Sequence, residues 1–219
     1  HFGIWKTEAK DTFHDWLEIL RDVSPPSLRE QLEKHDTGYT CHVHRTIDGV
    51  SLNSGQHGTP MRGPSDNQEQ EKYFPGKNKQ HRFKNQFVNL PEGKDIIDVE
   101  VGEKGLTSDI SLFREQQEKS HNNQIFEGDK GYQGGKNIST PYNKPDKKPR
   151  KGELTSEQKA GNKEFSTKGI FVEQVIRLVK IFRVPQQRFP LNSPIYSQVI
   201  LTICGLVTLG IGSLVLPIS

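Results

Sequence analysis

The segment KQHRFKNQFVNLPEGKDIIDVEVG, residues 79–102, carries the clearest fold signal in the chain. Two runs rich in Val, Ile and Phe, residues 79–90 and 95–102, flank PEGK at residues 91–94. β-Branched and aromatic residues favour strands, and a Pro-Gly stretch between two such runs favours a turn. The segment therefore predicts a β-hairpin.

The elements that follow the hairpin predict the class of the domain. TSDISLFREQQEK, residues 107–119, begins with Ser108 and Asp109 as candidate caps of a helix. QIFEGD, residues 124–129, reads as a short strand, and residues 164–183 read as an amphipathic helix after a polar connector. The order hairpin, helix, strand, helix indicates an α/β or α+β fold.

The amino-terminal part differs from this domain. Residues 1–35 predict a long helix, capped near Asp11 or Thr12, and a short second helix. Residues 36–70 lose all periodicity, so we expect irregular structure there. Residues 71–219 form the main predicted domain.

Composition limits the function classes. The 219 residues suffice for one domain with a small appendage, and a net charge of +3 does not by itself indicate a nucleic-acid partner. The two cysteines, Cys41 and Cys204, are far apart in sequence and form no Cys-x-x-Cys pattern, which disfavours a zinc site or a disulfide framework and suits a reducing cytoplasm. Because the chain starts with His1, we expect it to be part of a longer reading frame.

The carboxyl end, residues 198–219, carries no charged residue and is long enough to span a bilayer. Its three glycines, Pro217 and the absence of a basic flank favour a buried helix instead. A small membrane protein anchored by this tail remains a distant alternative.

Two acids are candidates for chemistry. Asp129 lies in a glycine-rich stretch, where aspartate commonly forms turns, and a single carboxylate holds Mg²⁺ poorly without partners. Glu173 precedes Arg177 by four residues and Lys180 by seven, so the three share one helical face. They form either an exposed ion pair or a metal ligand followed by cations that would stabilise a phosphoryl transition state.

Two basic clusters, residues 72–84 and 144–151, are candidate DNA contacts, although lysine-rich loops are often plain solvated connectors. Together with one helical arginine, the candidates are Lys77, Lys79, Lys84, Lys147, Lys148, Arg150 and Arg177.

FEGDKGYQGGKNISTP, and then KKPRKGELTSEQKAGNKEFSTKGIFVEQVIRLVKIFR, resemble the DDE transposases of bacterial insertion sequences. The similarity is to the branch whose closing motif places six residues between a glutamate and a lysine. It continues upstream through residues 66–116 and into the helical start of the chain, leaving out roughly residues 36–63.

The resemblance implies a ribonuclease-H-like fold, a mixed sheet flanked by helices on which three acids hold two divalent ions, Mg²⁺ or Mn²⁺. It implies hydrolysis at the ends of an element and then strand transfer into target DNA. Asp129 corresponds to the second acid, Glu173 to the third and Lys180 to the closing lysine. The implied partners are double-stranded DNA and a second copy in a homodimer, and the implied location is cytoplasmic and nucleoid-associated.

The chain departs from the family pattern at several positions. Gly169 occupies the place of an arginine, Gln174 follows the glutamate where a histidine is common, and Thr208 and Gly210 replace arginines in the tail. The first acid is also missing from its expected place.

A frameshift would explain the missing acid. GQHGTP, residues 55–60, can be encoded so that a reading frame shifted by one nucleotide gives Asp-Ser-Thr-Glu-His-Pro, close to the family's first motif. We therefore predict that residues 36–63 are out of frame between two compensating indels. The alternative is that Asp48 is the first acid and a metal ligand.

Two functions follow from these observations. The first is an enzyme, or its remnant, that cuts and joins DNA. The second is a non-catalytic DNA-binding or interaction protein that retains the fold. A third carboxylate near Asp129 and Glu173 would distinguish the two functions, because the enzyme needs it and the non-catalytic protein does not.

Overall fold

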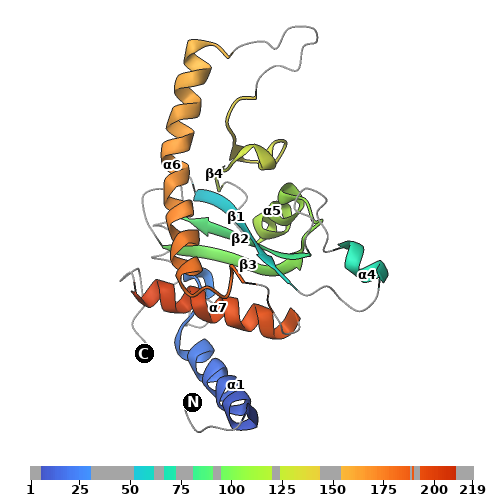
Figure 1. The fold of residues 1–219 in the computed structure, drawn as a ribbon. Coiled ribbons are helices and arrows are strands. Elements are labelled where there is room, and N and C mark those ends of the chain that lie inside the picture. The colour runs from blue at the N-terminus through green and yellow to red at the C-terminus, as the bar shows by residue number, and fades with distance from the viewer. Residues whose placement is uncertain are drawn as a thin grey trace.

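A computed structural model describes one five-stranded sheet with helices packed on both of its faces (Figure 1). The description covers residues 6–30, 52–61, 67–72, 81–90, 95–119, 124–143, 154–187, 189 and 193–210.

The sheet has the order β3-β2-β1-β4-β5. β2 is antiparallel to both β1 and β3, whereas β4 is parallel to both β1 and β5. The predicted hairpin is confirmed as β2 and β3. The strands are β1 (Leu52–Pro60), β2 (Arg82–Asn89), β3 (Ile96–Lys104), β4 (Phe126–Glu127) and β5 (Ile138–Ser139).

The helices complete the mixed α/β architecture that the sequence predicts, so the expected fold class is confirmed. A single 3₁₀ turn, η1 (Lys130–Tyr132), follows β4. The helices are α1 (Lys6–Val23), α4 (Asn67–Lys72), α5 (Asp109–Glu118), α6 (Ser156–Ile181) and α7 (Ser193–Gly210).

Three boundaries differ from the predictions. α6 starts at Ser156 and not near 164, because Thr155 and Gln158 form a capping box whose Thr-x-x-Gln spacing was visible in the sequence. α1 starts at Lys6, before the expected caps. The short strand β5 lies inside the predicted connector.

The largest correction concerns residues 36–70, which were predicted to be irregular. Within them, Leu52–Pro60 form β1, and its neighbours β2 and β4 place it in the middle of the sheet. Eight residue pairs link β1 to β2. Strand pairing uses backbone groups, so a segment poor in strand-forming side chains is still held by two flanking strands.

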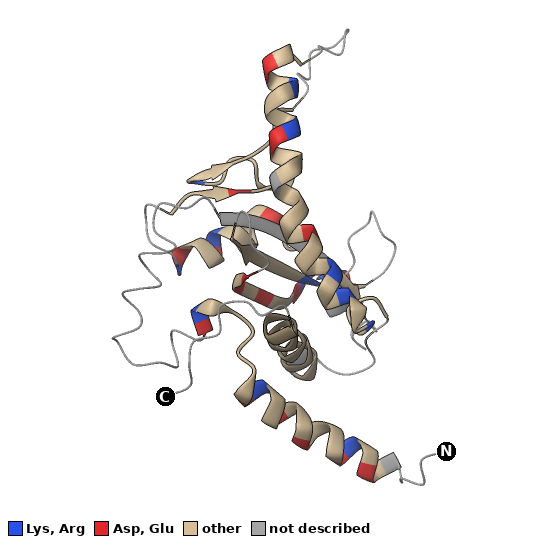
Figure 2. Cartoon of the chain, turned by 90° about the vertical axis from the view of Figure 1, so that its left-hand side faces the viewer, with Lys and Arg blue, Asp and Glu red and all other residues tan. Residues whose placement is uncertain are grey.

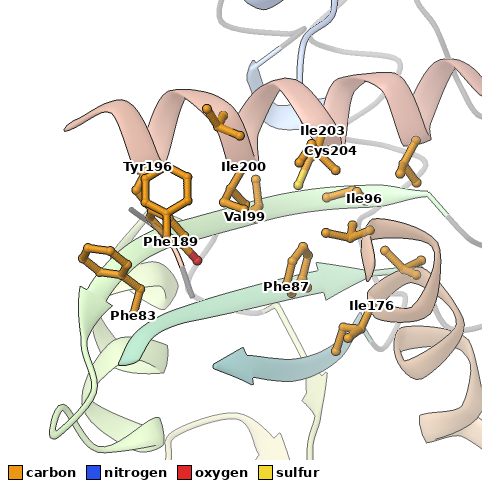
Figure 3. Close-up of a cluster of buried hydrophobic side chains, with 14 of the residues drawn as sticks. Phe83, Phe87, Ile96, Val99, Ile176, Phe189, Tyr196, Ile200, Ile203 and Cys204 are labelled. Carbon is orange, nitrogen blue, oxygen red and sulfur yellow. The ribbon is translucent and has the colours of Figure 1, made fainter. Parts of the chain in front are cut away.

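Side chains that alternate along β2 and β3 build two cores. Phe83, Phe87 and Val99 join the larger core under α6 and α7, which Figure 3 shows. Val88 and Ile97 face the other way and join Phe113 of α5. In β2 the period-two alternation of strand side chains explains this division. In β3 the pairing register shifts beside Ile97, so that Ile97 and Val99 face opposite sides although they are two residues apart.

α7 lies across the larger core and is fixed by a polar contact inside it. Tyr196 stacks on Phe83 with ring centroids 4.1 Å apart, and the Asn85 amide donates a 2.6 Å hydrogen bond to the Tyr196 hydroxyl. Burial raises the pKa of the neighbouring Cys204 thiol to about 12, so this cysteine acts as a core side chain.

The prediction of a packed helix in the uncharged tail is confirmed for α7, whose buried residues belong to the larger core. Among the residues that the structure describes, none of the helices has the length and apolar character needed to cross a membrane.

The contact between α7 and the chain after α1 depends on a glycine. A Cβ placed on Gly205 would lie 2.1 Å from the Ser24 carbonyl oxygen and 2.7 Å from its carbon. These are backbone atoms, so they can move away only if α1 separates from α7. Gly205 therefore sets the distance between the two helices.

We expect Gly205→Ala to lower the free energy of unfolding by about 1–3 kcal/mol, the usual cost of overpacking. Gly169→Ala is the matched helical control, because a Cβ there meets nothing within 4 Å. The change also removes the free-energy cost of a glycine inside a helix. It should stabilise the chain by up to about 1 kcal/mol. Urea unfolding at one protein concentration measures the stability of both variants. Equal unfolding midpoints for Gly205→Ala and Gly169→Ala would contradict the role of Gly205.

Candidate functional site

Asp129 lies two residues beyond β4 and is exposed. Its Oδ1 accepts a 2.8 Å hydrogen bond from the Gly131 backbone N–H, which makes Asp129 the cap of η1. The turn-forming role that its glycine-rich surroundings indicated is thus present. The carboxylate is nevertheless exposed, so the same side chain remains accessible to a ligand.

A second carboxylate lies beside this turn. A Cβ on Gly131 would come within 2.6 Å of Asp109 Oδ2 and 3.0 Å of Asp129 Oδ1. Asp109 belongs to the first turn of α5. A side chain at position 131 would therefore push the Asp109 or the Asp129 carboxylate out of its present place.

Lys84 on β2 holds Asp109 in place. Its Nζ lies 2.7 Å from Asp109 Oδ1 and also donates to the Thr107 carbonyl oxygen. The lysine side chain is 19% exposed, so it is largely enclosed by its own chain. Lys84 was predicted to contact DNA, but the structure gives it an internal partner instead.

The strand register brings the expected place of the first acid next to Asp129. β1 and β4 pair in parallel, with Leu52 opposite Phe126 and Asn53 opposite Glu127. The paired residues end at Asn53 and Glu127, and the same register continued by two residues would align Gly55 with Asp129. The predicted frameshift placed the missing aspartate at residues 55–56, and LNSGQHGTP on β1 contains no carboxylate.

Glu173 lies on the exposed side of α6, whereas Val172, Val175 and Ile176 of the same helix are buried over the sheet. α6 packs against β1, the strand that also pairs with β4. Glu173 and Asp129 therefore come from elements that both adjoin β1.

Arg177 is exposed and Lys180 is half-buried on the same helix as Glu173. Within the described part of the chain, Glu173 and Arg177 form no ion pair, so the simple surface salt bridge that the spacing allowed is not made there. Gly169 stands one turn earlier with open space around it, where a longer side chain would fit.

No group of three or more His, Cys, Asp or Glu side chains that could hold a metal ion occurs among the described residues. The candidate ligand Asp48 lies outside those residues, and so do five of the predicted DNA contacts: Lys77, Lys79, Lys147, Lys148 and Arg150.

Sequence reasoning missed that Asp109 lies beside the turn of Asp129 and is bound by Lys84. Asp109 was noted as a cap candidate, and the structure assigns the cap itself to Ser108. Nothing in the spacing of residues 84, 109 and 131 signals that they meet, because each lies on a different element.

The chain is similar to a probable transposase and to a solved transposase structure. The probable transposase for insertion sequence element IS702 from Microchaete diplosiphon is 36% identical over 120 residues, which cover 55% of this chain and 43% of that protein. The chain thus spans less than half the length of this relative. A cryo-EM structure of the piggyBac transposase synaptic complex with hairpin DNA is similar with a TM-score of 0.42 and 10% identity, over 82% of this chain and 52% of that one.

A family model described as DDE superfamily endonuclease matches residues 58–208, which include β2 to β5, α5, α6 and most of α7. Since this match covers well over half of the chain, the protein belongs to the DDE superfamily endonucleases.

Proposed function

We propose that this chain is a degenerate transposase, derived from an enzyme that cleaved DNA at the ends of a mobile element and transferred the strands by two-metal phosphoryl transfer. The observation that carries the proposal is the register of β1 and β4. Continued by two residues beyond its last pair, this register aligns Gly55, a residue without a carboxylate, with Asp129, which supports the loss of one acid in a chain of this endonuclease family.

Asp129 and Glu173 are the residues that would hold Mg²⁺ or Mn²⁺. Both side chains are exposed and offer the hard oxygen donors that these ions prefer. One oxygen of Asp129 already accepts the Gly131 N–H, so its second oxygen is the one available to an ion. Each acid offers donors that suit such an ion, and together they supply fewer carboxylates than the family's three.

A bound divalent ion would supply Lewis-acid stabilisation of the charge that develops on phosphate. The protein's own contribution is to fix the carboxylates. The cap of η1 orients Asp129, and the buried face of α6 orients Glu173. Lys180, half-buried two turns after Glu173, would add positive charge near a phosphate.

The alternative is a non-catalytic DNA-binding relic. It is favoured by the lack of any Asp or Glu on β1, the strand that adjoins both acid-bearing elements. Losing one ligand from a two-metal site removes part of several kcal/mol of stabilisation, and each 1.36 kcal/mol is about tenfold in rate. A chain that has lost catalytic activity in this way could still bind DNA.

Double-stranded DNA is the proposed partner, and a cytoplasmic, nucleoid-associated location would follow from it. α6 extends beyond the sheet and carries basic side chains along its length (Figure 2). Lys159, Lys163 and Arg177 are exposed on it. Such a basic helix beside Glu173 would contact the phosphate backbone.

We expect the chain as it stands to show no Mg²⁺- or Mn²⁺-dependent cleavage of DNA that carries its element's ends. Restoring the reading frame across residues 36–63 should raise the cleavage rate by at least about a hundredfold, because a third carboxylate joins the site. Gel assays with both ions measure the rate.

Asp129→Asn in the restored chain is the matched control and should abolish the gained activity while leaving the fold intact by circular dichroism. Cleavage by the unrestored chain would contradict the degeneracy. A restored chain that folds but does not cut would contradict the assignment of the missing acid, and so would codons for residues 55–60 that cannot encode aspartate in the shifted frame.

We expect Arg177→Gln to weaken binding to duplex DNA at every sequence and to reduce the slope of log K against log salt by about 1, since one phosphate contact is lost. Arg114→Gln, an exposed change on α5, is the control and should leave the slope unchanged. Fluorescence anisotropy across a salt series measures both. Equal slopes for the two variants would contradict a DNA contact at Arg177.

A further inference from the structure

The chain leaves α6 through a residue with an unfavourable backbone conformation. α6 ends at Ile181 with Phe182 as its cap, and the next residue, Arg183, has φ +61°. Residues with a side chain rarely adopt this left-handed conformation, because their Cβ comes too close to the following carbonyl oxygen. The position after a helix cap is usually taken by glycine, which has no Cβ. An arginine at position 183 is therefore disfavoured by its own backbone.

The other positive-φ positions show how the chain usually meets this demand. Gly102 and Gly134 have φ of +82° and +83°, and Asn137 has φ +52°, which the short polar side chain of asparagine tolerates. Among the residues that the structure describes, Arg183 is thus the one whose side chain does not suit its positive φ. A long side chain that persists at such a position points to a function of the side chain itself.

Hydrogen bonds fix the backbone of Arg183 on both sides. Its N–H donates a 2.9 Å hydrogen bond to the Lys180 carbonyl oxygen, and its own carbonyl oxygen accepts the N–H groups of Gln186 and Gln187 at 2.9 and 3.0 Å. Val184, the next residue, packs against the larger core. The turn therefore presents the Arg183 side chain before any ligand binds, so that less conformational freedom is lost on binding.

The guanidinium group has no anionic partner of its own. Arg183 is exposed, and in the described ranges it forms neither an ion pair nor a side-chain hydrogen bond. No Asp or Glu occurs in residues 174–219. Arg177, Lys180 and Arg183 thus follow one another at three-residue intervals with no acid between them, and Figure 2 shows basic residues gathered on the last turns of α6. Such a local excess of positive charge suits a polyanion.

We propose that Arg183 binds a backbone phosphate of duplex DNA, and that the arginine is retained there against the preference of its backbone. This inference rests on the proposed function, in which double-stranded DNA is the partner. The planar guanidinium donates two parallel hydrogen bonds to phosphate oxygens, a geometry that lysine cannot reproduce.

The phosphate at Arg183 is not the one that would react. Ile181, the last residue of α6, lies about 12 Å along the helix axis from Glu173. Arg183 is therefore a binding residue that positions the duplex at a distance from the carboxylates. It extends the proposed DNA contact beyond the end of α6 and onto the turn that follows.

A purely structural role for Arg183 makes a different prediction. A positive charge at the carboxyl end of a helix interacts favourably with the unpaired carbonyl groups there. In that role the side chain would stabilise the fold and would be indifferent to DNA. Stability and DNA binding measured on the same variants therefore distinguish the two roles.

Arg183→Gly and Arg183→Ala form a matched pair for stability. Both remove the guanidinium group, but only glycine also removes the Cβ that makes the left-handed conformation unfavourable. Urea unfolding of the full chain should give a ratio of folded to unfolded protein about two- to fivefold higher for Arg183→Gly than for the parent. Arg183→Ala should unfold close to the parent.

Fluorescence anisotropy with a labelled duplex of random sequence measures binding by the same proteins. Arg183→Gly and Arg183→Ala should both bind about fivefold more weakly at about 0.15 M salt, and the slope of log K against log salt should fall by about 1. Arg183→Lys keeps the charge and should keep the slope. Arg114→Gln, an exposed change on α5, is the control and should bind like the parent.

A variant that is more stable than the parent and binds DNA less well is the expected result for Arg183→Gly. Binding equal to the parent by Arg183→Gly and Arg183→Ala, while Arg177→Gln weakens it, would overturn this inference and leave the proposed function standing. Lower stability of Arg183→Gly than of the parent would also overturn it, in favour of the structural role. A parent chain that fails to bind the duplex at low salt would contradict the DNA partner itself, and this inference with it.

Discussion

The backbone pairing of β1 with its two neighbours is the constraint on which the rest of the structure depends. β1 joins the antiparallel hairpin on one side to the parallel pair β4 and β5 on the other, and α6 packs against it. A central strand receives hydrogen bonds along both edges, so its position does not require strand-forming side chains. LNSGQHGTP can therefore occupy the middle of the sheet while contributing few apolar side chains to either core.

Because β1 is held by backbone pairing, the fold does not depend on which side chains β1 carries, whereas the chemistry of the site does. The two cores take most of their side chains from β2, β3, α5, α6 and α7, together with Leu17 of α1, Phe126 of β4 and Tyr132 of η1. None of that packing requires a carboxylate on β1. A change that replaces the side chains of β1 can thus remove an acid from the site while the sheet, and the elements that carry Asp129 and Glu173, keep their arrangement.

Much of the fold could be predicted because the relevant signals are local. The Val- and Phe-rich runs around residues 91–94 predicted the hairpin, Ser108 predicted the start of α5, and the apolar face of residues 171–179 predicted α6. β1 could not be predicted in this way, since its pairing is supplied by distant segments. The start of α6 could have been predicted, because the Thr155 to Gln158 capping-box spacing is local to the sequence.

For the candidate site, the sequence supplied Asp129 and Glu173 through a family resemblance, whereas the contact of Asp109 with Gly131 depends on tertiary packing.

The turn that carries Asp129 lies beside Asp109 of α5, and Asp109 is in turn bound by Lys84 of β2. A side chain at position 131 would displace a carboxylate, and without Lys84 the Asp109 carboxylate would face that of Asp129 with no compensating charge. Selection on position 129 should consequently extend to positions 84, 109 and 131. In relatives of this protein these four sites should vary together, and in copies of the gene that have lost activity they should be free to drift as a group.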